Sequence, residues 1–342
     1  MKSIITRVIA KKKFFFIIFF IVLVSLLIYG FVTKTPNSSP QTISVKGETN
    51  HEKSIEVERT TLIGAWLGTW PSKTEKNIES FNQLSNHHSD IIHTYVFTTQ
   101  DMDDWESFMD YVHEQGAINL LTIMMRNSDN GEYSTVDVNN GRLDAYYTAL
   151  AIQMKNWQGG SEIWIQPMYE ANGYWFGWGI GNSGVNTNES FRMAFQRIVK
   201  IFRDNGAYNV KFVYNVNYGN NGEGASFMDA YPGDGYVDFV SIDGYNWGTS
   251  QTWSKWYSFR QTFDAAYEAL VNGSNKPVII AEVASAEKGG DKAAWISDMK
   301  KQIQSGAYPE LIAVIWFNDY DKYQKVDWRI DSSDSSLAAY QR

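Results

Sequence analysis

Eight short runs of apolar, often β-branched residues recur along the chain after residue 61, with longer segments of helical spacing between them. Segment 189–206 predicts a helix, because its apolar side chains recur at intervals of 4, 3 and 4 residues: Phe191, Phe195, Ile198 and Phe202. Gly206 and Gly273 close two of these segments, where we expect left-handed residues that end the helices. The eight predicted strands are 62–68, 91–97, 117–125, 162–169, 210–217, 237–245, 277–284 and 311–318.

Continuous apolar strands that alternate with helices indicate a parallel sheet covered on both faces. Eight such units within residues 61–342 predict a (β/α)8 TIM barrel. The alternative is an open, doubly wound sheet, which usually carries a G-x-G-x-x-G turn after its first strand. The residues that follow the first run read TWPSK, without that motif, so the pattern favours the barrel.

The amino-terminal segment has the pattern of a membrane element. Residues 14–32 are free of charge, and a helix of this length would span roughly 28 Å, enough to cross a hydrocarbon core. Because the basic residues lie in segment 1–13, we expect that tail in the cytoplasm and everything after residue 32 outside the cell. A cleaved signal peptide is the alternative, but the apolar run is longer than usual and no A-x-A site follows it.

Residues 33–60 are polar and cannot bury enough apolar surface to fold alone, so we interpret them as an extracellular linker. The predicted organisation is therefore a basic tail (1–13), a transmembrane signal anchor (14–32), this linker and a barrel (61–342). We expect the barrel to be monomeric.

Composition excludes several classes of function. The chain has no cysteine, which rules out a disulfide framework, zinc–cysteine sites and a thiol nucleophile. Residues 1–13 carry five basic side chains and no acid, so the net charge of −8 leaves −13 on the remainder. A body this acidic repels phosphate backbones, and we expect no nucleic-acid partner.

Aromatic residues are unusually frequent, at 15% of the chain, and all 13 Trp lie between Trp66 and Trp328. Such rings can fill a core, but they also offer flat apolar faces on which sugar rings stack. The strand ends favour the second use for several of them. Aromatic, amide and acidic side chains gather at the ends of the fourth, sixth and eighth strands: Tyr174, Trp175, Phe176, Trp178, Asp243, Tyr245, Asn246, Trp247, Trp316 and Asn318.

Two glutamates occupy positions where charge is costly. Glu170 directly follows the fourth strand, and Glu282 lies near the end of the seventh, within the apolar sequence VIIAEVA. Active sites of barrel enzymes lie at these carboxyl ends, and paired carboxyl groups there suit cleavage of a glycosidic bond. A metal site would need further ligands, and the five His residues have no H-E-x-x-H spacing, so we expect neither metal nor cofactor.

The chain resembles glycoside hydrolase family 26, whose members are retaining endo-β-glycanases with catalytic glutamates on strands four and seven. The similar segments cover roughly residues 62–330 and occur in the family's order: QPMYEANGYWFGWG, YPGDGYVDFVSIDGYNW, KPVIIAEVAS and IAVIWFNDYDKYQKVDWRI. The resemblance implies that Glu170 is the acid/base and Glu282 the nucleophile. It also implies that Tyr245 hydrogen-bonds the nucleophile, and that Trp175 and Trp316 line the subsite at the point of cleavage.

The chain departs from the family's mannanases just before the acid/base. Those enzymes commonly read R-P-x-H-E, whereas this chain has Gln166 and Tyr169 at the Arg and His positions. Mannan is therefore one candidate substrate, beside mixed-linkage β-1,3-1,4-glucan and β-1,3-xylan. We place Tyr169, Trp178 and Asp243 among the substrate-binding residues.

The reaction implied is double displacement on a polysaccharide, with no cofactor. Retention requires carboxyl groups about 5–5.5 Å apart, and we expect the pKa of Glu170 to be raised by its negative neighbour and its aromatic loop. Two other functions stay open: a non-catalytic glycan-binding protein, and a transglycosylase that acts on a nascent cell-surface polysaccharide.

Overall fold

The computed structural model describes residues 61–68, 75–129, 131–182, 184–219 and 225–342. The predicted basic tail, signal anchor and linker (1–13, 14–32 and 33–60) lie outside the described residues. Among the helices of the described part, none is long and apolar enough to cross a membrane.

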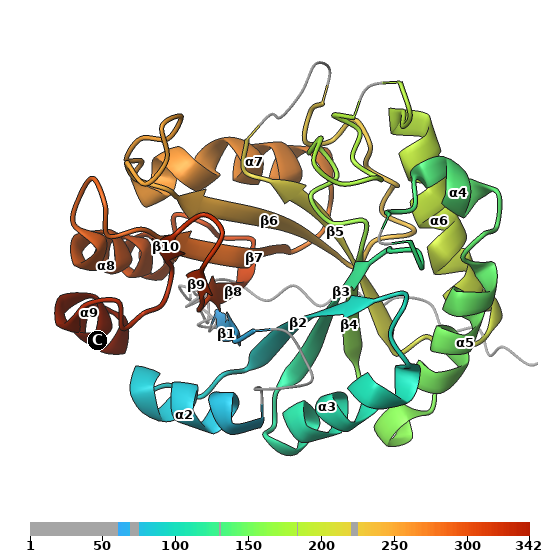
Figure 1. The fold of residues 1–342 in the computed structure, drawn as a ribbon, viewed down its shortest axis with the longest axis horizontal. Coiled ribbons are helices and arrows are strands. Elements are labelled where there is room, and N and C mark those ends of the chain that lie inside the picture. Colours follow the sequence, from blue (N-terminus) through green and yellow to red (C-terminus); the bar gives the residue numbers. More distant parts are fainter. Residues whose placement is uncertain (1–60, 69–74, 130, 183, 220–224) are drawn as a thin grey trace, which may run out of the picture. The chain divides into compact units, whose positions relative to one another are not determined.

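Eight parallel strands pair in chain order, and the last pairs with the first, so the sheet closes into a barrel (Figure 1). At the closure, Leu62 lies opposite Ala313 and Trp66 opposite Phe317. This closure confirms the predicted (β/α)8 barrel over the open sheet, which would keep two unpaired edges. The strands are β1 (Leu62–Trp66), β2 (Ile91–Phe97), β3 (Ile118–Met124), β4 (Ile163–Pro167), β5 (Val210–Asn217), β6 (Phe239–Asn246), β7 (Val278–Ser285) and β8 (Leu311–Phe317).

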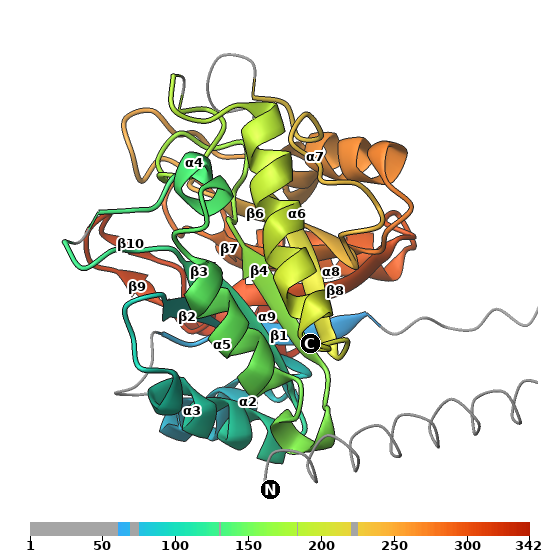
Figure 2. The same ribbon diagram turned by 90° about the vertical axis from the view of Figure 1, so that its right-hand side faces the viewer.

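The helices lie outside the strands, as Figures 1 and 2 show from two directions. Three of them begin with a capping box, in which Ser134, Thr187 or Ser258 accepts a hydrogen bond from the backbone three residues on. The helices are α2 (Glu75–Ser85), α3 (Met102–Glu114), α4 (Thr135–Asn139), α5 (Asp144–Met154), α6 (Asn188–Asp204), α7 (Phe259–Gly273), α8 (Lys292–Gln304) and α9 (Asp334–Gln341), with a short 3-10 turn at Trp157–Gly159 and a two-stranded hairpin of β9 (Tyr320–Asp321) and β10 (Val326–Asp327).

The two glycines that were expected to end helices do so for different reasons. Gly206 follows α6 with a φ of 81°, the left-handed conformation that was predicted. Gly273 is the last residue of α7 and does not have a positive φ; a Cβ there would lie 2.7 Å from Cε of Met228. Close packing, rather than backbone conformation, accounts for glycine at this second position.

Two apolar clusters lie on the two faces of the strand layer, one outside the barrel and one inside it. The larger one lies between strands and helices, and includes the predicted apolar face of α6. The smaller one fills the inside of the barrel near the amino ends of the strands: Ile91, Leu120, Trp164, Val213, Ile279, Ala281, Ala313 and Ile315.

Beyond the inner apolar cluster, the next inward positions along β2 to β6 are polar. Side chains alternate between the two faces of a strand, so a residue two positions after an inward apolar one also faces inward. Hydrogen bonds across the barrel connect several of these side chains, including His93 with Thr122 (2.8 Å) and Asn215 with Ser241 (2.8 Å). The carboxyl ends of the strands thus form a buried polar layer, where the fold places the candidate site.

Candidate active site

Glu170 lies just after β4, in a backbone turn that few residues adopt. Met168 and Glu170 have φ values of 50° and 49°, in the left-handed region that is uncommon outside glycine. The neighbouring strand holds this turn, because Asn215 of β5 accepts from the amide of Glu170 through Oδ1 (2.6 Å) and from the amide of Ala171 through its carbonyl (3.0 Å). The strained turn is thus stabilised from β5.

The carboxyl group of Glu170 is buried, and each of its oxygens accepts one hydrogen bond. Asn217 donates from Nδ2 to Oε1 (2.6 Å), and Trp175 donates from Nε1 to Oε2 (2.6 Å). One partner comes from β5 and the other from the loop after β4, so the carboxyl group has a defined orientation. Of the predicted stacking residues, Trp175 is both in contact with a glutamate and 39% exposed.

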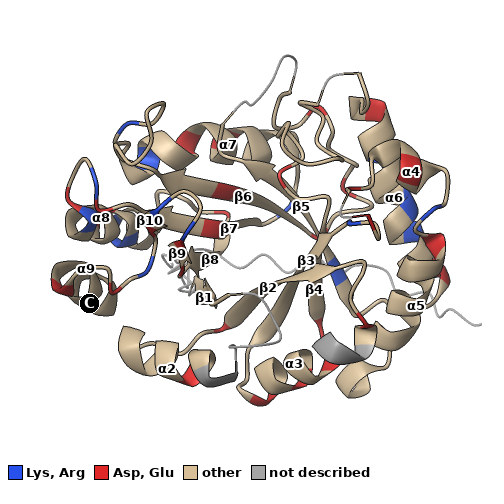
Figure 3. Cartoon of the chain, in the orientation of Figure 1, with Lys and Arg blue, Asp and Glu red and all other residues tan. Residues whose placement is uncertain are grey.

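Glu282 owes its direction to a bulge in β7. Ile280 pairs with Ile242 of β6, but the next pair is Glu282 with Asp243, which leaves Ala281 as an extra residue. A bulge redirects the side chain that follows it. Because of the bulge, Ala281 belongs to the inner apolar cluster and the side chain of Glu282 still reaches the polar layer. β6 and β7 each carry one acidic residue, Asp243 and Glu282, coloured red in Figure 3.

Two tyrosine hydroxyls hold the carboxyl group of Glu282. Tyr95 of β2 donates to Oε1, and Tyr245 of β6 donates to Oε2. The contact with Tyr245 agrees with the role that the resemblance implied. His93 lies behind them, with Nδ1 3.9 Å from Oε1, but burial lowers its pKa to about 3, so the imidazole is neutral.

Burial dominates the ionisation of the site. It raises the pKa of Glu170, against the opposing effect of the hydrogen bonds from Asn217 and Trp175. Burial, with the charge of Glu170 second, raises the pKa of Glu282 to about 8, although the two tyrosine hydroxyls favour its ionised form. Two carboxyl groups in one low-dielectric site disfavour a double negative charge, and the pair therefore titrates as a unit.

Asp243 is a third buried acid beside the pair. Its Oδ1 accepts from Nδ2 of Asn215 (2.8 Å), and burial together with the charges of Glu282 and Glu170 raises its pKa well above the usual range. Burial and the two neighbouring carboxyl groups thus both favour the neutral form of Asp243. Through Asn215 it is connected to the backbone of Glu170, so Asp243 supports the turn after β4 from below.

Aromatic rings form a wall beside Glu282. The ring of Tyr245 packs against Trp328 and Phe317, with ring centroids 5.1 Å and 5.6 Å apart, respectively. Phe317 in turn stacks on Trp66, with centroids 4.1 Å apart and an interplanar angle of 6°. This wall joins β1, β6, β8 and the segment after β10.

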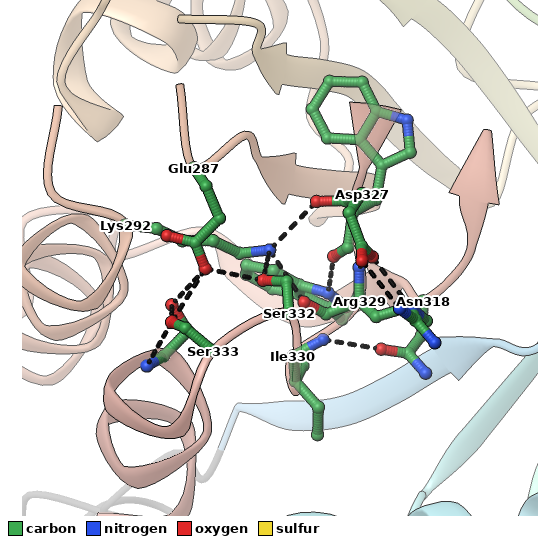
Figure 4. A network of polar contacts seen from close by, with 11 residues as sticks. Glu287, Lys292, Asn318, Asp327, Arg329, Ile330, Ser332 and Ser333 are labelled. Atoms are coloured by element: carbon green, nitrogen blue, oxygen red, sulfur yellow. Dashed lines mark hydrogen bonds and ion pairs between the residues drawn. The ribbon is translucent and has the colours of Figure 1, made fainter. Parts of the chain in front are cut away.

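A polar network holds the segment that carries Trp328 (Figure 4). The buried ammonium group of Lys292, at the start of α8, donates to the carbonyl of Arg329 (2.7 Å) and to Oγ of Ser332 (2.8 Å). Glu287 accepts from the hydroxyls of Ser332 (2.7 Å) and Ser333 (2.9 Å). These contacts anchor residues 329–333 to the loop after β7, and so stabilise the aromatic wall.

Two predicted substrate-binding residues after β4 are buried beneath the site. Trp178 is fully buried, donates to the carbonyl of Tyr169 (2.8 Å) and stacks on Phe176. Tyr169 is also buried, and its hydroxyl contacts Sδ of Met124 at 2.9 Å. The structure therefore places both rings under the loop that carries Trp175, where they support the site without facing the solvent.

Trp316 does not lie beside the two glutamates. Ala313 and Ile315 face the barrel interior, so the alternation of β8 turns Trp316 outward and Phe317 inward. Trp316 is 1% exposed, donates to the carbonyl of Trp328 (2.9 Å), and lines a cavity of about 820 Å³ with Lys300 and Tyr340 of the helix layer. Phe317 is the residue of β8 that contacts Tyr245.

Sequence reasoning missed several residues that hold the glutamates: Tyr95, Asn215 and Asn217. All three lie two or four positions after an inward apolar residue of their strands, which is the signal that could have found them. Asn215 and Asn217 lie in the buried second half of β5, where an amide needs a partner.

A closed parallel barrel with two buried glutamates at its strand ends, beside an aromatic wall, has the arrangement of a glycoside hydrolase. The model of glycosyl hydrolase family 26 matches residues 124–326. Endoglucanase H of Acetivibrio thermocellus is 49% identical over 280 residues, which are 81% of this chain and 30% of that protein. The mannan endo-1,4-β-mannosidase of Bacillus subtilis is 25% identical over 189 residues, which are 53% of this chain and 46% of that protein.

Solved structures have the same fold. A Bacillus subtilis mannanase superposes with a TM-score of 0.59 at 19% identity, covering 83% of this chain and 85% of the other. A β-mannanase of Bacteroides ovatus gives 0.62 at 16% identity, covering 83% and 88%. The chain belongs to glycosyl hydrolase family 26. It spans less than half the length of each of the two named sequence relatives.

Proposed function

We propose that this glycoside hydrolase is a retaining endo-β-glycanase that cleaves mixed-linkage β-1,3-1,4-glucan in preference to mannan. The observation that carries the proposal is the pairing of Glu170 and Glu282 in one buried layer, each held by two hydrogen-bond donors. Burial raises the pKa of both carboxyl groups, and their mutual repulsion favours a pair that holds one proton. The two hydroxyl donors to Glu282 favour its ionised form, which suits a nucleophile, and the shared proton is then carried by Glu170, which suits an acid.

In the first half-reaction, an oxygen of ionised Glu282 attacks the anomeric carbon. The bond from that carbon to the leaving sugar's oxygen breaks, and protonated Glu170 donates its proton to this oxygen. In the second half-reaction, Glu170 takes a proton from water, the water oxygen attacks the anomeric carbon, and the bond to Glu282 breaks. The donors to Glu170 keep its charged form accessible, as the second step requires.

The position before the acid/base supports glucan over mannan. Mannanases of the family commonly carry His there, whereas the hydroxyl of Tyr169 is directed to Met124 and carries no charge near neutral pH. Gln166, at the usual Arg position, is buried and accepts from Ser241 instead of presenting a cation. The relative with 49% identity is named an endoglucanase, which supports the same choice.

The test measures reducing ends released by the full chain from mixed-linkage β-glucan, glucomannan, mannan and β-1,3-xylan. We expect the fastest release from β-glucan, and the loss of release in Glu282→Ala and Glu170→Ala. Azide should restore turnover in both variants, giving an α-glycosyl azide with Glu282→Ala and a β-glycosyl azide with Glu170→Ala, because it replaces a different partner in each.

Each alternative has its own result. A first product with inverted anomeric configuration would contradict the retaining mechanism. Faster release from mannan would overturn the substrate choice, and binding without release would favour a glycan-binding protein. Longer oligosaccharides formed at high acceptor concentration would favour the transglycosylase.

We also propose that residues 14–32 anchor the protein in the membrane, with a monomeric barrel outside the cell. The uncharged run and the basic tail before it support this location. In intact cells, the anchor predicts a protein that sediments with membranes, retains its amino terminus, and is digested by added protease. Recovery of a soluble form that starts after residue 32 would instead indicate a cleaved signal peptide.

A further inference from the structure

Two of the most exposed aromatic side chains lie on neighbouring loops at the site's end of the barrel. Trp253, in the loop between β6 and α7, is 66% exposed, and Tyr323, at the tip of the β9–β10 hairpin, is 84% exposed. Gln251 joins the two loops by donating from Nε2 to the carbonyl of Gln324 (2.8 Å). Large rings exposed to water on adjacent loops are typical of a binding surface.

The loop that carries Trp253 is tied down on both sides of the ring. Ser254 donates through its hydroxyl to the carbonyl of Gly248 (2.8 Å), and the amide of Thr249 donates to the carbonyl of Lys288 (2.9 Å). Gly248 has a φ of 53°, and a Cβ there would lie 1.8 Å from the carbonyl oxygen of Lys288. This glycine permits close approach of two loops, so Trp253 is presented from a fixed backbone.

The hairpin tip is ordered in a similar way. Oδ1 of Asp321 accepts from the amides of Tyr323 and Gln324, each at 2.9 Å. The turn is thus closed by a side chain of the hairpin itself, and its tip is linked to the β6–α7 loop through Gln251. Both rings are therefore held where a ligand could meet them with little ordering of the protein.

A continuous series of rings connects this surface with the candidate nucleophile. The ring centroids of Trp253 and Trp247 are 5.2 Å apart. The centroid of Trp247 lies 6.0 Å from that of Tyr245 and 4.8 Å from that of Trp328. Tyr245 donates to Glu282. Trp253 is thus the outer end of the aromatic wall of the active site, and the hairpin that carries Tyr323 is joined to its loop through Gln251.

From this continuity we propose that Trp253 and Tyr323 form a distal platform for the polysaccharide chain. The platform would stack the apolar faces of sugar units several positions away from the bond that is cleaved, on the side of the site formed by β6, β7 and β8. The occupant is an extended, unbranched β-glucan chain; short oligosaccharides do not reach the platform. This inference rests on the proposed function, because it names the path of the same substrate.

The test compares the full chain with Trp253→Ala, Tyr323→Ala and the double variant. Tyr208→Ala is the matched control: Tyr208 is 69% exposed, but it lies just before β5, at the opposite end of the strands. With barley β-glucan we expect KM to rise roughly threefold to tenfold for Trp253→Ala, with kcat nearly unchanged. With an aryl β-glycoside of two glucose units, kcat/KM should not change, and Trp253→Phe should restore most of the affinity.

A binding measurement separates this inference from the proposed function. Retardation in gels that contain barley β-glucan, glucomannan, mannan or β-1,3-xylan needs no turnover, and the Glu282→Ala background removes hydrolysis. Loss of retardation in Trp253→Ala, but not in Tyr208→Ala, would support the platform even if no polymer were cleaved. Cleavage of β-glucan by all variants with unchanged KM and retardation would overturn the platform and leave the proposed function intact.

Discussion

The two halves of the barrel interior use the same strands for different purposes. Near the amino ends of the strands, the inward side chains are apolar and pack on one another, as do Leu120, Val213 and Ile279. Near the carboxyl ends, the inward positions of the same strands carry Thr122, Asn215 and the Glu282 that follows the bulge. Side-chain alternation decides which residues face inward, and position along the strand decides whether they pack or react.

The halves also differ in what their burial costs. Burial of the apolar half stabilises the fold at about 25 cal/mol per Å² of surface removed from water. In the polar half, burial raises the pKa of Glu170, Glu282 and Asp243, because a charged carboxyl group loses its hydration.

The largest effect should come from Glu282→Gln, which keeps the shape of the side chain and removes the nucleophile. We expect kcat on β-glucan to fall by about 10⁴-fold or more, with circular dichroism unchanged. A fall of less than tenfold would mean that Glu282 does not attack the substrate.

The same variant tests the cost of burial through pH. Burial raises the pKa of Glu282 from 4.5 to about 8. Between these values the unfolded state releases the proton and the folded state keeps it, so wild-type stability falls as pH rises. We expect Glu282→Gln to gain stability relative to wild type between about pH 4.5 and pH 8, measured by denaturant unfolding. A relative loss over that interval would reverse the sign of our argument.

In the apolar half, Ile279→Ala should do the opposite: destabilise the fold and leave the chemistry intact. We expect a loss of about 2–5 kcal/mol in the free energy of unfolding, because a buried side chain leaves a cavity. At temperatures where the variant is folded, kcat should stay within about twofold of the wild-type value. A large fall in kcat without loss of stability would show that the two halves are coupled.

A smaller effect is expected for Tyr245→Phe, which removes one donor from Glu282 and keeps the ring in the aromatic wall. The ionised form of Glu282 loses a hydrogen bond, so its pKa should rise further. We expect kcat to fall about 10- to 100-fold and the acidic limb of the pH profile of kcat/KM to move to higher pH. An acidic limb that moves to lower pH would contradict the assigned contact.

The smallest effect should come from Trp316→Phe. The outward ring loses its hydrogen bond to the carbonyl of Trp328 and some volume, so we expect a loss of about 1–2 kcal/mol in stability. KM for β-glucan should not change, in contrast to Trp253→Ala. A tenfold rise in KM at unchanged stability would place Trp316 in the cleft after all.

The strands and the two glutamates could be predicted from the sequence because their signals are local. An apolar run of eight residues can be recognised in the sequence without its neighbours, and so can the charged Glu282 inside such a run. Which side chains of β8 face inward, and where β7 has its bulge at Ala281, depend on how neighbouring strands pair. No single segment of the sequence reveals this pairing. For this reason Trp316 was expected at the point of cleavage and Phe317 was not, while Tyr95 could not be told from a core tyrosine.

The closure of β8 onto β1 has a consequence for biosynthesis. Tyr95 and Glu170 leave the ribosome well before Glu282, and the Trp328 segment and its contacts with Lys292 come later still. Barrel closure joins residues from the two ends of the described chain, which makes it a contact of high sequence separation. Glycan cleavage therefore requires that β8 and the Trp328 segment have been synthesised and inserted, and its onset would report that the last strand is in place.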